Sequence, residues 1–204
     1  ITNLIGGETL TFSGSGSVAS ANVQSGQSIT NGTLSINDGT GLASNYNLTT
    51  GTFDITQRWV TLTGTRSYDG TTTADSSDLV ISNLVAGETL GLTGNGTVAS
   101  KNVGSNKTIT DISLTLTDGS GLATNYTIGT KTFNITQQAI SIDGSKVYDG
   151  NTTVAAANIS TFNGLALTET LTISGSGTVN APQVGTNKTV TLGTLALADG
   201  TNGG

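Results

Sequence analysis

Short stretches in which apolar and polar residues alternate recur along the whole chain. Val60-Thr61-Leu62 and Leu114-Thr115-Leu116 are two examples, and in both of them every second side chain is apolar. Because successive side chains of a β-strand point to opposite faces, this pattern predicts strands with one buried and one exposed face. No stretch has a convincing helical period, and the best helical candidate, residues 73–78, is about one turn long. The sequence therefore predicts an all-β protein.

The alternating pattern itself repeats, with a period of about 80 residues. Shifting the sequence by this period makes nearly half of the positions identical. The shared motifs include Gly7-Glu8-Thr9-Leu10 with Gly87-Glu88-Thr89-Leu90, Asn45-Tyr46 with Asn125-Tyr126, and Tyr68-Asp69-Gly70 with Tyr148-Asp149-Gly150. A third copy follows one residue out of step, and a single insertion between Gly150 and Glu169 explains the offset. Such self-similarity is typical of a tandem array.

The repeat predicts where the modules of the array begin and end. Residues 1–57 are expected to be the C-terminal part of a first module, residues 58–137 a complete module, and residues 138–204 the N-terminal part of a third. No linker composition separates the second module from the third, which predicts a fairly stiff linear rod. Both ends fall inside a repeat, so we expect the chain to be a piece of a longer array.

Composition favours small modules over one large core. The chain has only four Phe, four Tyr and one Trp, so each core must be built mainly from Val, Ile, Leu and Ala. We expect each module to be a two-layer antiparallel β-sandwich of the immunoglobulin-like kind, with Val60, Leu62 and Phe12 among the core residues. The alternatives are a β-grasp-like module and a β-solenoid. Solenoid coils usually repeat about every 20–30 residues, and no such shorter period is found here.

The ordered set of repeated motifs resembles a known family. The residues Tyr68-Asp69-Gly70-Thr71-Thr72-Thr73, followed by Gly87-Glu88-Thr89-Leu90, Lys101-Asn102-Val103-Gly104, Lys107-Thr108-Ile109 and Asn125-Tyr126, resemble the YDG-domain repeat. Departures are Gln24 and Gln27 in place of Gly104 and Lys107, and Ala181-Pro182 in place of Lys101-Asn102. The resemblance implies a stalk module of large bacterial exoproteins of the filamentous-haemagglutinin type, often secreted by two-partner systems. It therefore implies an extracellular or cell-surface location and an adhesion or biofilm-matrix context.

The motif residues are interpreted as structural. Asp followed by Gly suits a tight turn, because Asp accepts local N–H groups and Gly adopts positive φ. The residues that we single out as structural signature turns are Tyr68, Asp69, Gly70, Tyr148, Asp149, Gly150, Asn45, Tyr46, Asn125 and Tyr126. A ligand-contacting role for these loops is the alternative.

Several classes of function are disfavoured. The chain has no His and no Cys, and its carboxylates are mostly isolated, so we expect no enzyme, no cofactor and no catalytic or metal site. Calcium between modules stays open as an alternative. The net charge is −6 and the seven basic residues are scattered, which argues against nucleic-acid binding. No apolar run is long enough to predict membrane insertion.

The expected function is structural. We expect a stalk or filament repeat of a secreted or cell-surface bacterial adhesin, which spaces or assembles an extracellular fibre. Its partners would be neighbouring modules of the same chain, or other copies that associate into fibres. The alternative is a module that binds a host glycan, a matrix polysaccharide or a neighbouring filament directly. Thr108 and Thr110, on the polar face of a predicted strand, keep that alternative open.

Overall fold

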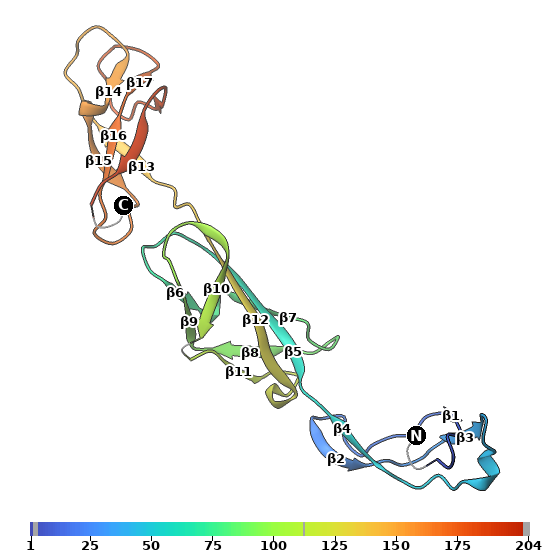
Figure 1. Ribbon diagram of the computed structural model, residues 1–204. Coiled ribbons are helices and arrows are strands. Elements are labelled where there is room, and N and C mark those ends of the chain that lie inside the picture. Colours follow the sequence, from blue (N-terminus) through green and yellow to red (C-terminus); the bar gives the residue numbers. More distant parts are fainter. Residues whose placement is uncertain (2–3, 112, 202–204) are drawn as a thin grey trace. The chain divides into compact units, whose positions relative to one another are not determined.

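The computed structural model describes residues 1, 4–111 and 113–201 (Figure 1). These residues form an all-β protein, as the alternating pattern predicts. The helical pieces within these ranges are 3-10 turns: η1 (Ala43–Asn45), η2 (Ser76–Asp78), η3 (Ala123–Asn125) and η4 (Ala156–Asn158). The helical candidate at residues 73–78 forms a short strand followed by η2. The chain divides into two compact units.

The first unit comprises Ile1–Leu62, Ile81–Thr93 and Thr115–Thr130. It contains three two-stranded antiparallel sheets. These pair β1 (Leu10–Ser13) with β3 (Ser35–Asp38), β2 (Gln24–Ser28) with β4 (Thr52–Ile55), and β8 (Leu90–Thr93) with β11 (Thr115–Asp118). Each of these sheets is therefore small, and few other strands lie next to its two strands to cover their side chains.

The second unit comprises Thr63–Val80, Gly94–Leu114 and Lys131–Gly204. Most of a six-stranded sheet lies in it, with the strand order β6-β9-β10-β12-β5-β7. The strands are β5 (Arg58–Ser67), β6 (Thr73–Asp75), β7 (Leu79–Ser82), β9 (Asn95–Val98), β10 (Gly104–Asp111) and β12 (Tyr126–Thr136). The sheet curls into a half-barrel (Figure 1).

The C-terminal part of the second unit forms three further sheets. In them β13 (Ser141–Gly144) pairs with β15 (Ile159–Asn163), and β16 (Leu171–Ser174) pairs with β19 (Ala196–Asp199). The third sheet has the order β14-β17-β18, formed by Thr153–Ala155, Ser176–Val179 and Val190–Thr191.

Equivalent strand pairs have the same register in successive repeats. Leu10 lies opposite Asp38, Leu90 opposite Asp118, and Leu171 opposite Asp199. The pair β2–β4 also matches β10–β12: Gln27 faces Phe53 where Lys107 faces Phe133, and both pairs shift register at the same place. The repeat in the sequence is thus a repeat in strand pairing.

The inserted residue of the third copy lies in β15. Thr161 faces Asp143 and Ile159 faces Gly144, so that Ser160 is an extra residue between two paired positions. The equivalent strand β7 has four residues, whereas β15 has five. A β-bulge accommodates one additional residue in this way without changing the rest of the ladder.

The largest fully buried side chains are Phe133, Leu62, Ile109, Ile135 and Val60. Val60 and Leu62 are buried as the alternation predicts. Phe12, also expected in the core, is instead 55% exposed. It lies in the two-stranded sheet β1–β3, which is too small to bury the ring by itself.

Candidate functional site

The Tyr-Asp-Gly motif forms a turn held by a cation three residues before its aspartate. Arg66 forms an ion pair with Asp69, which also accepts the backbone N–H of Thr71 at 2.9 Å. Gly70 has φ +81°, a left-handed conformation that favours glycine. The turn thus forms immediately after β5 and is stabilised by side chains close in the sequence.

The second Tyr-Asp-Gly motif forms the same kind of turn, with a lysine as the cation that pairs with its aspartate. The Lys146 ammonium donates to Asp149 at 2.8 Å, and Asp149 accepts the N–H of Asn151 at 3.1 Å. Gly150 has φ +78°. The hydrogen bond from Lys146 holds the pKa of Asp149 below its usual value. The ring of Tyr148 is 62% exposed.

The Asn-Tyr motif and the Gly-Glu-Thr-Leu motif meet in the first unit, and they do so in both copies. The Tyr46 hydroxyl donates to Glu8 at 2.5 Å and accepts the Ile5 N–H at 3.3 Å. Tyr126 likewise donates to Glu88 and accepts the N–H of Val85. The hydrogen bond to the carboxylate raises the pKa of each tyrosine. The tyrosine thereby joins two motifs that are far apart in the sequence.

The asparagine of this motif ends a 3-10 turn in both copies, and in the second copy its side chain also bonds to the preceding repeat. The Asn125 side chain accepts the Val23 N–H at 2.9 Å and donates to the Asn22 side-chain oxygen at 2.9 Å. The N–H of Asn45 bonds to the Leu42 carbonyl oxygen, and the N–H of Asn125 bonds to the Leu122 carbonyl oxygen in the same way. Asn125 therefore links two successive repeats within the first unit.

Among the residues of the second unit whose burial the structure describes, the most enclosed charged group is Glu169, whose side chain is only 5% exposed. The Lys101 ammonium lies 2.5 Å from its Oε1 oxygen, and the Tyr68 hydroxyl donates to the same oxygen. Lys101 also lies 5.9 Å from the centre of the Tyr68 ring. The hydrogen bond from Lys101 and, to a smaller extent, the hydrogen bond from Tyr68 hold the pKa of Glu169 below its usual value. The carboxylate is therefore kept ionised in an enclosed place.

An open hollow of about 670 Å³ adjoins this carboxylate. Its wall includes Tyr68, Val103, Ile140 and Leu165 beside Glu169. The polar group is thus set in largely apolar surroundings, where a charged hydrogen bond is stronger than in water. Lys101, Tyr68 and Glu169 form one ion-pair cluster that joins the predicted second and third modules within the second unit.

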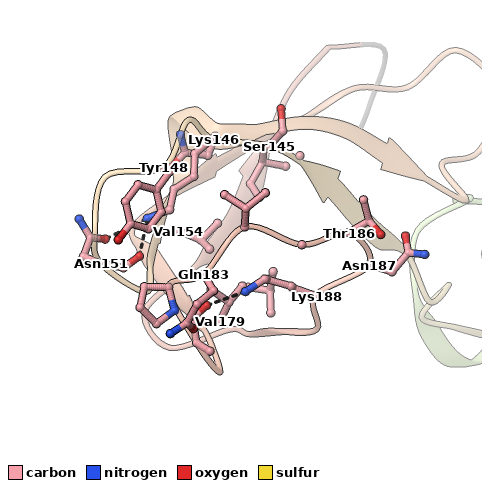
Figure 2. Close-up of a pocket in the computed structure, with 18 of the residues that line it drawn as sticks. Ser145, Lys146, Tyr148, Asn151, Val154, Val179, Gln183, Thr186, Asn187 and Lys188 are labelled. Atoms are coloured by element: carbon pink, nitrogen blue, oxygen red, sulfur yellow. Dashed lines mark hydrogen bonds between the residues drawn. The ribbon is translucent and has the colours of Figure 1, made fainter.

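A second hollow, of about 460 Å³, lies in the C-terminal part of the second unit (Figure 2). Tyr148, Lys146 and Asn151 border it at one end, and Val154 and Val179 contribute apolar wall. Lys188, from the opposite loop, donates to the Ala181 carbonyl at 2.8 Å. The side chains of Lys146, Asn151, Asn158 and Lys188, which line this hollow, are hydrogen-bonded within the protein.

One family model matches this chain, over residues 55–133 and again over residues 130–204, and it describes the YDG domain. The two matches together cover more than half of the chain. The chain belongs to the YDG-domain family. No curated protein and no solved structure shows a significant match. The resemblance inferred from the motifs is confirmed for the YDG domain itself.

The two YDG matches contain both Tyr-Asp-Gly turns, the ion-pair cluster residues Tyr68 and Lys101, and its partner Glu169. Sequence reasoning singled out the tyrosines but missed the glutamates that they bind. The sequence did indicate these glutamates. Gly-Glu-Thr-Leu recurs in the first two copies, and Glu169 occupies the equivalent position in the third. A glutamate repeated at one place in a chain poor in charge is a candidate partner for a repeated tyrosine.

Among residues 1, 4–111 and 113–201, no group of three or more Asp, Glu, His or Cys side chains is placed to hold a metal ion. Within the same part of the chain, no helix has the length and apolar character needed to cross a membrane.

Proposed function

We propose that this chain is a structural repeat segment of a secreted or cell-surface bacterial adhesin of the filamentous-haemagglutinin type. Its YDG modules would be sandwich-like units in a linear, fairly stiff rod that spaces or assembles an extracellular fibre. In this proposal the chain has no catalytic activity, and its partners are neighbouring modules and other copies.

The ion-pair cluster is the observation that carries this proposal. Tyr68 and Lys101 lie within the first YDG match, whereas Glu169 lies within the second. A signature tyrosine of one module therefore contacts the next module, which supports a structural role for the motif. A buried, doubly hydrogen-bonded carboxylate limits relative motion because moving it away would leave a charge without partners.

Direct glycan binding is the second candidate. Asn106, Thr108 and Thr110 lie on the exposed face of β10, where hydroxyl and amide groups are open to solvent. Exposed threonines are also common on strands without any ligand, because their branched side chain suits the pleat. The spacer interpretation therefore explains them equally well.

A display experiment separates the two candidates. The chain is inserted, in one or two copies, between a cell-surface anchor and an unrelated binding domain, and access of that domain to a bulky target is measured. A spacer should increase access with copy number, and cells displaying the chain alone should not bind glycan arrays or matrix polysaccharide.

The matched control carries Asn106→Gly, Thr108→Ala and Thr110→Ala. Asn106 has φ +53°, so glycine keeps that backbone conformation. If access does not rise with copy number, the chain binds a polysaccharide and these three substitutions abolish that binding, the glycan-binding proposal replaces the spacer.

A further inference from the structure

The two longest strands among the residues that the structure describes lie side by side in the six-stranded sheet (Figure 1). They are β5, with 10 residues, and β12, with 11. Along the chain, β5 is the first strand of this sheet and β12 is the last. All other strands of the sheet therefore come from the segment of chain between these two neighbours.

The contacts between β5 and β12 show that these two strands run in the same direction. Within the first unit, a Cβ on Gly129 would lie 3.2 Å from the Val60 carbonyl oxygen. Within the second unit, the Asn134 side-chain amide donates to the Thr65 hydroxyl at 3.3 Å. The residue numbers of the two partners rise together from the first contact to the second. The pair β5–β12 is therefore parallel.

The inner face of this parallel pair is shielded from water. The two strands contribute four core side chains that are at most 2% exposed: Val60, Leu62, Phe133 and Ile135. Neither strand lies at an edge of the sheet, because β7 is next to β5 and β10 is next to β12. Water therefore has little access to replace the hydrogen bonds between β5 and β12, and breaking them leaves polar groups without partners.

A pull along the chain reaches the six-stranded sheet through these same two strands. It acts on Arg58, the first residue of β5, and on Thr136, the last residue of β12. Because the strands are parallel, the two pulled residues lie at opposite ends of the pair, and the strands can separate only by sliding past each other. All hydrogen bonds between them are then loaded together, whereas an antiparallel hairpin pulled at its open end loses them one at a time.

We propose that β5 and β12 form a shear clamp, which lets the segment from Arg58 to Thr136 bear tension along the chain. The bonds between the two strands are the barrier to forced unfolding, which follows the rate of unfolding and not the equilibrium stability. Bearing tension goes beyond the length and stiffness of a spacer. The inference does not depend on a cell-surface location, because resistance to force is measured on the isolated chain.

The direction of pulling tests the clamp while the fold stays the same. The chain has no native cysteine, so the handles of a single-molecule force experiment can be attached at two introduced cysteines in the full 204-residue chain. Thr56→Cys with Gln137→Cys loads β5 and β12 in shear. Ser67→Cys with Gln137→Cys places both handles at the same end of the pair, so that its bonds break one at a time. All three positions are exposed.

At one loading rate, the unfolding force in the shear geometry should be at least about twofold larger than in the other geometry. Unfolding in shear should release up to about 280 Å, the extended length of the segment from Arg58 to Thr136. Residues before Thr56 and after Gln137 lie outside the loaded path, so the flanking repeats do not contribute to this force. Equal unfolding forces in the two geometries would overturn the proposal.

A matched pair of core substitutions separates the clamp from general stability. Ile135 in β12 and Ile109 in β10 are 2% and 1% exposed, so Ile135→Ala and Ile109→Ala should lower the urea midpoint by similar amounts. Only Ile135 lies in a clamp strand, so Ile135→Ala should lower the unfolding force in shear by more than Ile109→Ala does. Equal losses of force would show that the force follows the stability of the whole core, and the clamp would be rejected.

Discussion

At the residue scale, Glu169 is a buried carboxylate kept ionised by Lys101 and Tyr68. Its pKa lies below the ordinary value of 4.5. Between that lowered pKa and the ordinary one, the unfolded chain binds a proton that the folded chain does not. The contribution of Glu169 to stability is therefore present above pH 4.5 and is lost as the pH falls through the lowered pKa.

The first prediction concerns this pH dependence. Glu169→Gln removes the titrating group, so the urea midpoint of the second unit should fall less steeply between pH 5 and pH 3 than in the wild type. Lys101→Met should also reduce the steepness, because the ammonium is the largest cause of the lowered pKa. Identical slopes in the wild type and Glu169→Gln would show that Glu169 has no such role.

A second prediction compares two glycines that share a backbone conformation. Gly87 has φ +86° and open space where a Cβ would lie, whereas Gly94 has φ +84° and a Cβ there would lie 2.2 Å from the Ser113 carbonyl oxygen. Gly87→Ala should cost about 1 kcal/mol of stability from backbone strain alone. Gly94→Ala should cost more, by about 1–3 kcal/mol, because backbone must move to relieve the contact.

Urea unfolding of both glycine variants checks this comparison. The same close contact recurs in the other copies, at Gly14 with Thr33 and at Gly175 with Thr194. Equal costs for Gly87→Ala and Gly94→Ala would mean that this contact does not constrain the fold.

Residue roles could be read from the sequence only where the partners are close along the chain. Asp69 and Gly70 form the turn that their types favour, with the cation Arg66 three residues away. The bond from Tyr68 to Glu169 spans 101 residues. A motif indicates which side chains form a turn, but it does not indicate which distant element packs over that turn.

At the scale of elements, the sequence predicted strands and their repetition well. Alternation places Val60 and Leu62 correctly in the core. The same alternation occurs around Phe12, which is 55% exposed. Alternation identifies the apolar face of a strand, but burial also requires a second layer or further strands over that face. The sequence pattern of a single strand contains no information about that cover.

The third prediction uses one residue type at two equivalent places. Phe133 is fully buried in the six-stranded sheet and Phe53 is 54% exposed in a two-stranded one. Phe133→Ala should cost about 3–5 kcal/mol of stability, whereas Phe53→Ala should cost less than about 1 kcal/mol. Chemical denaturation of both variants measures the difference. Similar costs would mean that the two strands are equally covered.

At the scale of the whole molecule, the period of about 80 residues predicts an array of modules. The two YDG matches and the shared strand registers show the repeat itself, whereas the module bounds stay a prediction. That the array serves an adhesive or filamentous protein is part of the proposal and not of the fold. We propose that the YDG modules form a mechanical spacer whose successive modules are held together by Tyr68, Lys101 and Glu169.

The most direct test measures a distance across the ion-pair cluster. The chain has no native cysteine, so spin labels can be placed at Thr110→Cys and Ser174→Cys, two exposed strand positions in the second unit. Pulsed electron paramagnetic resonance should give a narrow distance distribution that broadens when Lys101→Ala and Glu169→Ala are added. A distribution that is already broad in the otherwise wild-type chain, and that the two substitutions leave unchanged, would contradict the account.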